Sequence, residues 1–446
     1  MSLAIGRPDR PPPDDPSLDE GIIRGGRLGG VDAETIAARF GTPCYVYDLA
    51  AIDRQVESLR SALPAVAEVA YAVKANPALA VVAHLGASGL GADVASAGEL
   101  ATALRAGIEP GRIVMTGPGK RDDELRAAVV AGVRAVTVES PGELARLEAI
   151  AATAGRRVPV MLRAAATGVA RLERVRLVGD DGAGKFGMDA EDLVASARTT
   201  VGSAHLDWLG LHAFGASNVL DADSIVAHVA ATARTARELA VVTGTPVGLI
   251  DAGGGLGIAY QPEDGSLDLG RLGRGIAEIT AGWADDPRLR DARLLLEPGR
   301  FLVGPAGVYL ARVVDRKSVD GSTVVILDGG VHHLLRPALV GQTHRVRTVA
   351  EPMGQGEEPG GPITIAGPLC SGLDVFSRHA IMATPEVGDL LAVLDVGAYG
   401  FTESMPLFLS HPVPAEVVVR DGQMALIRPR QEPREWLDRQ IVPGFA

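Results

Sequence analysis

Lys74 is the residue of this chain whose position best suits covalent chemistry. It lies in the stretch YAVKANP (71–77), at the end of a run with the length and composition of a β-strand, and Pro77 falls where a helix would begin. Burial makes a charged lysine costly and lowers its pKa towards that of a nucleophilic amine. The position therefore predicts Schiff-base chemistry, although a lysine at a strand end can also extend to solvent.

Two later motifs could act on a cofactor. The run DAGGGLG (251–257) would let backbone amides approach a phosphate closely, although three glycines are as often a tight turn. It lacks the spacing of a dinucleotide-binding fingerprint. Glu297, in EPGR (297–300), could sit beneath a protonated heteroaromatic nitrogen or pair with an arginine as a structural contact.

Three residues of the C-terminal part also have side chains suited to a site. Cys370, in GPLCSGLD, is a candidate proton donor or nucleophile, or else a small buried hydrophobe. Arg336, in LLRP, could hold a substrate carboxylate through two hydrogen bonds or lie on a surface turn. Tyr399, in DVGAYG, could give its hydroxyl group to a phosphate or only pack.

The pattern of apolar runs predicts the elements that position these residues. Eight strand-like runs alternate with helical segments, which favours an α/β fold with a closed (β/α)8 TIM barrel over a doubly wound open sheet. Reactive or glycine-rich groups follow nearly every run, as expected at the C-terminal ends of barrel strands. Later β-rich runs predict a C-terminal β-sandwich or Greek-key domain. We expect a disordered Pro/Asp-rich tail at 1–20 and a segment at 21–45 that pairs with the β domain. The barrel is expected at 46–303 and the β domain at 304–446.

The overall composition narrows the choice of partners. The 446 residues carry a net charge of −12, which argues against binding to nucleic acid or to an anionic membrane surface. Cys44 and Cys370 lie far apart without metal-ligand spacing, so we expect no metal site, no disulfide framework and a cytoplasmic location. No apolar run reaches the length of a membrane span. A small-molecule partner is therefore expected.

The ordered motifs resemble one enzyme family. YAVKANP, GADVASAGEL, TGPGK, KFG, GGGLG, EPGR, RPAL and GAYG resemble the fold-type III pyridoxal-phosphate-dependent decarboxylases, which include the diaminopimelate and ornithine decarboxylases. The resemblance implies pyridoxal 5'-phosphate as cofactor, joined to Lys74 as a Schiff base, with Glu297 at the pyridine nitrogen. Further cofactor-binding residues that it implies are Asp93, Arg163, His212, Phe214, Ser217, Gly253, Gly254, Gly255, Gly299, Arg300 and Tyr399.

The resemblance also implies a mechanism and an assembly. The cofactor ring stabilises the carbanion left by decarboxylation, and Cys370 returns a proton to Cα. The substrate would be an L-amino acid or the D-centre of a diamino acid, bound by Arg336, Ser371 and Asp374. The family builds each site across a homodimer, so Cys370 and Asp374 would come from the neighbouring subunit.

Several residues depart from the family's motifs. Phe214 stands where a histidine usually stacks on the cofactor, so either Phe214 or His212 would take that role. Ser371 replaces an acid that recognises a distal ammonium group, and FLSHPVPAEVVV (408–419) resembles a branch of the family from natural-product and siderophore pathways. We therefore expect a modified or carrier-linked amino acid as substrate. An acidic substrate tail is favoured by Arg171, Arg174 and Arg176.

Three alternatives remain open. The chain could be a diaminopimelate decarboxylase that makes L-lysine. It could be a racemase of the same barrel type, but such racemases tend to place an arginine against the pyridine nitrogen, so Glu297 favours a decarboxylase. A non-catalytic regulator that binds the cofactor would be expected to lose Lys74 or Cys370, and both are present.

Overall fold

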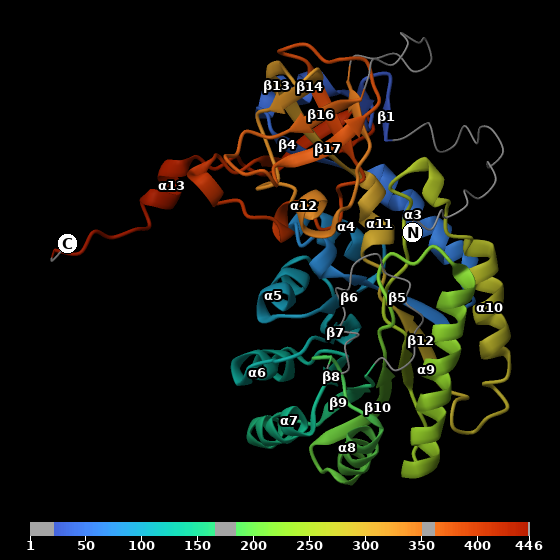
Figure 1. The fold of residues 1–446 in the computed structure, drawn as a ribbon. Coiled ribbons are helices and arrows are strands. Elements are labelled where there is room, and N and C mark those ends of the chain that lie inside the picture. The colour runs from blue at the N-terminus through green and yellow to red at the C-terminus, as the bar shows by residue number, and fades with distance from the viewer. Residues whose placement is uncertain (1–21, 166–183, 350–361, 445–446) are drawn as a thin grey trace, which may run out of the picture.

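A closed barrel of eight parallel strands forms the larger part of the fold (Figure 1). The computed structural model describes residues 22–165, 184–349 and 362–444. Each barrel strand is hydrogen-bonded to the next one along the chain, and the last strand pairs with the first. The strands are β5 (Ala67–Ala72), β6 (Gly91–Val94), β7 (Ile113–Met115), β8 (Ala135–Val138), β9 (Val158–Arg163), β10 (Leu206–His212), β11 (Leu249–Asp251) and β12 (Arg293–Leu296).

Helices surround the barrel because the sequence places start and stop signals after its strands. Ser96 and Ser140 accept hydrogen bonds from backbone N–H groups in the first helical turn, and Gly132 and Gly155 end helices in the left-handed conformation. The helices are α3 (Leu49–Ala62), α4 (Leu79–Ala87), α5 (Ala97–Arg105), α6 (Asp122–Ala131), α7 (Pro141–Ala154), α8 (Ala190–Gly202), α9 (Ala222–Thr243), α10 (Leu269–Ala281) and α11 (Arg300–Val303).

The second unit is a nine-stranded sheet. Its interior strand β4 precedes the barrel in the chain and pairs with β13 and β19, which follow the barrel, so the sheet joins both ends of the sequence. The sequence pattern did not predict β17, an edge strand with the half-polar sequence VFSRHA. The strands are β4 (Cys44–Asp48), β13 (Gly307–Val319), β14 (Ser322–Leu327), β15 (Val346–Thr348), β16 (Ile363–Ala366), β17 (Val375–Ala380), β18 (Leu390–Leu394), β19 (Ala415–Arg420) and β20 (Gln423–Arg428).

Smaller elements complete the chain. A three-stranded sheet of β1 (Ile23–Arg24), β2 (Arg27–Leu28) and β3 (Val31–Asp32), together with α2 (Ala33–Phe40), packs an apolar face against the large sheet. In Figure 1, α13 (Pro433–Leu437) projects away from the body of the molecule. Among the described residues, no helix is long and apolar enough to cross a membrane. The remaining helical elements are α12 (Arg336–Val340) and the 3-10 turns η1 (Val73–Ala75), η2 (Pro110–Arg112), η3 (Pro262–Asp264), η4 (Gly304–Ala306), η5 (Phe401–Glu403) and η6 (Phe408–Ser410).

The loop after β18 lies over the C-terminal end of the barrel. The Tyr399 amide donates to the Ala75 carbonyl at 2.8 Å, and the Asn76 side chain donates to the Gly397 carbonyl at 3.0 Å. The residues around Lys74 therefore lie where the two units meet. The predicted fold class, a TIM barrel followed by a β domain, is confirmed.

Candidate active site

Lys74 lies in η1, directly after strand β5 at the C-terminal end of the barrel. Its ammonium group donates to the Asp93 carboxylate at 2.8 Å, and Asp93 lies in the neighbouring strand β6. The other carboxylate oxygen of Asp93 accepts from the Thr116 hydroxyl at 2.5 Å. An ion pair with Asp93 thus positions Lys74 at the C-terminal end of the barrel, and the hydrogen bond from Thr116 positions Asp93 in turn.

The pKa of Lys74 differs in direction from the sequence-based expectation. Burial lowers the pKa of Lys74, but the negative charges of Asp93 and Glu297 outweigh that effect and raise the pKa above its ordinary value. The side chain is 42% exposed, so solvent screens these interactions and the direction is what matters. The expected lowered pKa is therefore wrong for this arrangement, because local sequence does not show how strongly the charges of Asp93 and Glu297 act on the amine.

Glu297 belongs to a buried cluster with His212 and Asp251. The three residues stand at or directly after the ends of β12, β10 and β11, which are adjacent strands of the barrel. The His212 Nε2 atom lies 3.4 Å from a Glu297 oxygen, and all three side chains are at most 3% exposed. Their ligand atoms lie within 4.8 Å of one another, a spacing that a metal ion could also bridge.

Electrostatic interactions shift the pKa values of Glu297 and Asp251 in opposite directions. Burial raises the pKa of Glu297, but its contacts with His212 and the charge of Lys74 outweigh burial and lower the pKa to about 2. Burial and the charge of Glu297 raise the pKa of Asp251 well above its usual range. Glu297 is therefore ionised at neutral pH, whereas the pKa of Asp251 is shifted in the opposite direction, as expected when two acids share one buried site.

The predicted glycines bring three backbone segments close together. A Cβ atom on Gly254 would lie 2.3 Å from the Glu297 carbonyl oxygen, and one on Gly255 would lie 2.2 Å from that of Ala216. Gly253 and Gly255 also have φ angles of 67° and 94°, which disfavour other residues. Close packing of the loops after β10, β11 and β12 is thus sufficient to require these glycines.

Arg300 and Tyr399 form a second group beside Glu297. The Arg300 guanidinium donates to the Tyr260 hydroxyl at 2.5 Å and to the Ser217 hydroxyl at 3.5 Å. It also lies 4.9 Å from the centre of the Tyr399 ring, a cation–π distance. Tyr399 has a φ of 54°, a strained value for a residue other than glycine, and such strain is common at functional sites.

Arg336 already has partners within the chain. It lies 5.0 Å from the centre of the Tyr399 ring, on α12, and its side chain is 4% exposed. One guanidinium nitrogen donates to the Glu403 carboxylate at 2.7 Å, and another donates to the Gln342 amide oxygen at 3.1 Å. A substrate carboxylate would therefore have to compete with Glu403 for this arginine.

Arg163 also pairs with an acid instead of standing free. Its guanidinium donates to the Glu139 carboxylate at 2.6 Å and lies 4.7 Å from the centre of the Phe186 ring. Phe214 is half-buried, and one of its ring carbons lies 3.0 Å from where a Cβ on Gly253 would be. Close packing against Phe214 is thus a further reason why Gly253 has no side chain.

The Cys370 loop lies apart from these residues. Cys370 is exposed, and among the described residues no hydrogen bond or ion pair joins it to the Lys74 and Glu297 cluster. Asp374 is buried, and its oxygens accept from the Val331 and Leu369 amides, both at 2.7 Å. The hydroxyl of Ser371 accepts from the Leu373 amide at 3.2 Å. Asp374 and Ser371 thus shape the loop that presents the thiol.

Sequence reasoning missed two residues near the site. Asp251 opens the predicted glycine run at a strand end, a signal that could have marked it as a site residue. Glu403 had no such signal, since only the packing of η5 against α12 brings it to Arg336. The arginines at 171, 174 and 176, and the tail at 1–20, lie outside the described residues.

Unsatisfied buried polar atoms gather in the space between these groups. Within the described part of the chain, they include Glu297 Oε1, Asp251 Oδ2, His212 Nδ1 and Arg300 Nε, each without a hydrogen-bond partner. Leaving such groups unpaired is costly. The donor set combines a carboxylate, a guanidinium and a nearby amine, which fits a ligand with a cationic ring nitrogen, a phosphate and an aldehyde.

Comparison with known proteins places the chain among enzymes with these properties. Residues 49–304 match the family described as pyridoxal-dependent decarboxylase, pyridoxal binding domain. The chain is 34% identical to a diaminopimelate decarboxylase of Zymomonas mobilis, over 91% of this chain and 94% of the relative. It is 32% identical to L-glutamyl-[BtrI acyl-carrier protein] decarboxylase of Niallia circulans, over 90% and 94%.

A solved structure agrees with these relatives. Diaminopimelate decarboxylase from M. jannaschii in complex with L-lysine has a TM-score of 0.84 and 28% identity, covering 95% of this chain and 98% of that one. The resemblance stated from the motifs is thereby confirmed. This chain belongs to the pyridoxal-dependent decarboxylases, and it is an enzyme, a carboxy-lyase whose cofactor is pyridoxal 5'-phosphate.

Proposed function

We propose that the chain decarboxylates an amino acid at the barrel mouth between Lys74 and Glu297. The observation that carries this proposal is that the exposed amine of Lys74 and the buried, ionised carboxylate of Glu297 lie at the same end of the barrel and act on each other's charge. When bound, the cofactor supplies an electron-withdrawing ring that stabilises the negative charge left as the carboxylate departs. An ionised Glu297 suits this chemistry, because it keeps a proton on the pyridine nitrogen.

Each end of the cofactor has a partner in this proposal. Lys74 supplies the amine that holds the aldehyde, and Asp93 keeps that amine at the barrel mouth. Arg300, Ser217 and the amides of the loop at 253–255 hold the phosphate, supported by the unpartnered Arg300 Nε atom. Phe214 and His212 are the candidates for contact with the ring. The contact of His212 with Glu297 favours Phe214 for stacking.

The proton donor comes from a second copy of the chain. Cys370 is exposed on a loop that makes no described contact with the Lys74 cluster, so its role in the reaction requires another subunit. In the proposed homodimer, Cys370 of one subunit returns a proton to Cα at the Lys74 of the other. Mixing Lys74→Ala with Cys370→Ala, each inactive alone, should then restore about a quarter of the sites. No recovery in a mixture shown to exchange subunits would contradict the shared site.

Two features support a substrate that differs from free diaminopimelate. Ser371 offers no carboxylate to a distal ammonium group, and Arg336 is already paired with Glu403. The relative from Niallia circulans acts on a glutamyl group attached to an acyl-carrier protein. We propose a modified or carrier-linked amino acid. Diaminopimelate is the alternative, favoured by the similarity to the Zymomonas mobilis enzyme.

The decisive experiment measures carbon dioxide release by the cofactor-loaded protein. Meso-diaminopimelate, L-glutamate and an L-glutamyl acyl-carrier protein are offered separately, with Lys74→Ala as the control. Release from the glutamyl carrier protein alone supports the proposed substrate class. Release of carbon dioxide with L-lysine from meso-diaminopimelate assigns the alternative. Turnover that persists in Lys74→Ala would overturn the proposed mechanism.

A further inference from the structure

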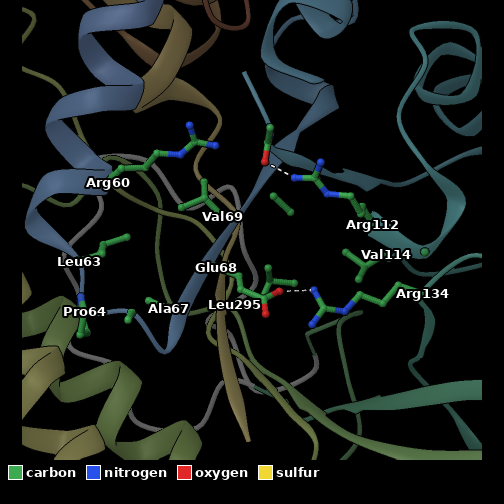
Figure 2. A pocket seen from close by; sticks show the side chains of 15 residues that line it. Arg60, Leu63, Pro64, Ala67, Glu68, Val69, Arg112, Val114, Arg134 and Leu295 are labelled. Atoms are coloured by element: carbon green, nitrogen blue, oxygen red, sulfur yellow. Dashed lines mark hydrogen bonds and ion pairs between the residues drawn. The ribbon is translucent and has the colours of Figure 1, made fainter. Parts of the chain in front are cut away.

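A cavity opens at the opposite end of the barrel from Lys74. It lies at the N-terminal ends of β5, β6 and β7, and Figure 2 shows the side chains that line it. Its volume is about 630 Å³. Ala70, Val114 and Leu295 line it and belong to the apolar layer that fills the barrel interior. The cavity thus ends on the barrel core and is separate from the site at the other end of the strands.

The only acid in the lining, Glu68, already has two basic partners. Arg134 and Arg293 both pair with it, the latter at 2.8 Å. Burial raises the pKa of Glu68, but the contacts with these arginines outweigh it and lower the pKa. The carboxylate is therefore ionised and two guanidinium groups share its single negative charge, so it does not compensate the other cations of the cavity.

Two further arginines of the lining, Arg60 and Arg112, both lie close to Gly89. The Arg112 guanidinium donates to the Gly89 carbonyl, and an Arg60 guanidinium nitrogen lies 3.3 Å from where a Cβ on Gly89 would be. Figure 2 shows Arg60 and Arg112 extending towards the same region from opposite sides. Among the described residues, no carboxylate lies within 4.0 Å of either guanidinium. Two positive charges thus lie close to Gly89, and no acid in the described part of the chain compensates them.

We propose that this cavity binds a small oxyanion between Arg60 and Arg112. Guanidinium groups present paired N–H donors that match carboxylate and phosphate oxygens. A protein of net charge −12 has little reason to gather uncompensated cations at one concave place unless an anion neutralises them. The apolar walls at Leu63 and Val69 leave room for a short hydrocarbon part. The ligand class is a small metabolite that carries a phosphate or carboxylate.

Titration calorimetry on the cofactor-loaded protein tests the proposal. The bound cofactor fills the phosphate subsite of the active site, and the Arg60→Gln variant separates binding in the cavity from binding of an oxyanion elsewhere. We expect saturable binding of one of them, weakened about tenfold or more in Arg60→Gln. Phosphate and citrate used separately distinguish the two kinds of oxyanion.

Two variants make the result decisive. Arg105→Gln removes an exposed arginine at the end of α5, outside the cavity, and should bind as the wild type does. Gly111→Glu adds a carboxylate to the lining at a position where a Cβ meets nothing within 4 Å, so it should abolish binding without a clash. Absence of saturable binding in the wild type overturns the proposal. Binding as tight as that of the wild type in both Arg60→Gln and Gly111→Glu overturns it as well.

Discussion

The two ends of the barrel differ in how completely their charged side chains are paired. At the C-terminal end, charged groups have partners at short range, with the Lys74 amine 2.8 Å from Asp93 and a His212 ring nitrogen 3.4 Å from Glu297. At the N-terminal end, Glu68 pairs with Arg134 and Arg293, but no carboxylate in the described part of the chain lies within 4.0 Å of the Arg60 or Arg112 guanidinium. The same strands β5, β6 and β12 run between both places.

Coverage by the rest of the chain explains this difference. The loop after β18 lies over the C-terminal end, where the side chains of His212, Asp251 and Glu297 are buried and their electrostatic interactions are strengthened. The N-terminal end has no such cover among the described residues, and Arg60 is exposed. Carboxyl groups with strongly shifted pKa values, such as Glu297 and Asp251, therefore occur at the covered end. Burial by a second unit, and not the barrel alone, creates the reactive environment.

The largest expected effect comes from Glu297→Gln at the covered end. A neutral amide cannot hold a proton on the cofactor's ring nitrogen, so kcat should fall by about 10²-fold or more. Cofactor content, measured by absorbance after denaturation, should remain near that of the wild type. A variant that binds cofactor and retains kcat within about threefold would show that the carboxylate does not act electronically.

Cys370→Ala extends the comparison beyond the barrel. As the proposed proton donor, Cys370 should contribute about 10²–10⁴-fold to the rate. Its removal should change the free energy of unfolding by about 0.5 kcal/mol or less, because the thiol is exposed. Cys44→Ala is the matched control. Burial raises the pKa of Cys44 to about 12, so this protonated core thiol should affect stability and not rate. Equal activity of both variants would contradict the assignment.

Acid should destabilise the protein through buried histidines near the covered end. Burial lowers the pKa of both His332 and His344 to about 4. The unfolded chain binds protons below about pH 6.5, so their contribution is complete above pH 6.5 and is lost as pH falls towards 4. At pH 5 the loss is about 2 kcal/mol for each histidine.

Urea unfolding at pH 7.5 and pH 5 measures this loss. His344→Gln should show a smaller fall in the unfolding midpoint than the wild type does. Glu297 contributes in a different window, because its lowered pKa of about 2 maintains its effect until pH falls below about 4.5. An unchanged midpoint between pH 7.5 and pH 5 would contradict the assignment to the histidines.

The smallest effect is expected at the open end. Glu68→Gln removes the partner of Arg134 and Arg293, but these groups are partly exposed, so stability should fall by about 1 kcal/mol or less. Activity should not change. Oxyanion binding by the cavity should strengthen, since one negative charge is removed. A loss of activity would show that the two ends are coupled and would break the comparison.

Much of the candidate site could be predicted from local sequence. Lys74, Asp93 and Glu297 follow apolar runs whose alternation with helices identifies a barrel, and a barrel gathers its strand ends at one face. Motif order then identified the family. Elements with weaker patterns were missed, as for β17, whose polar edge-strand sequence lacks a clear apolar alternation.

The sequence by itself determined the barrel, its cofactor chemistry and the order of residues around its mouth. Only the tertiary structure decided the charge state of those residues. The raised pKa of Lys74, the raised pKa of Asp251 and the pairing of Arg336 with Glu403 each depend on groups that are distant in the chain. Electrostatic interactions depend on distance and burial, and neither is encoded in local pattern.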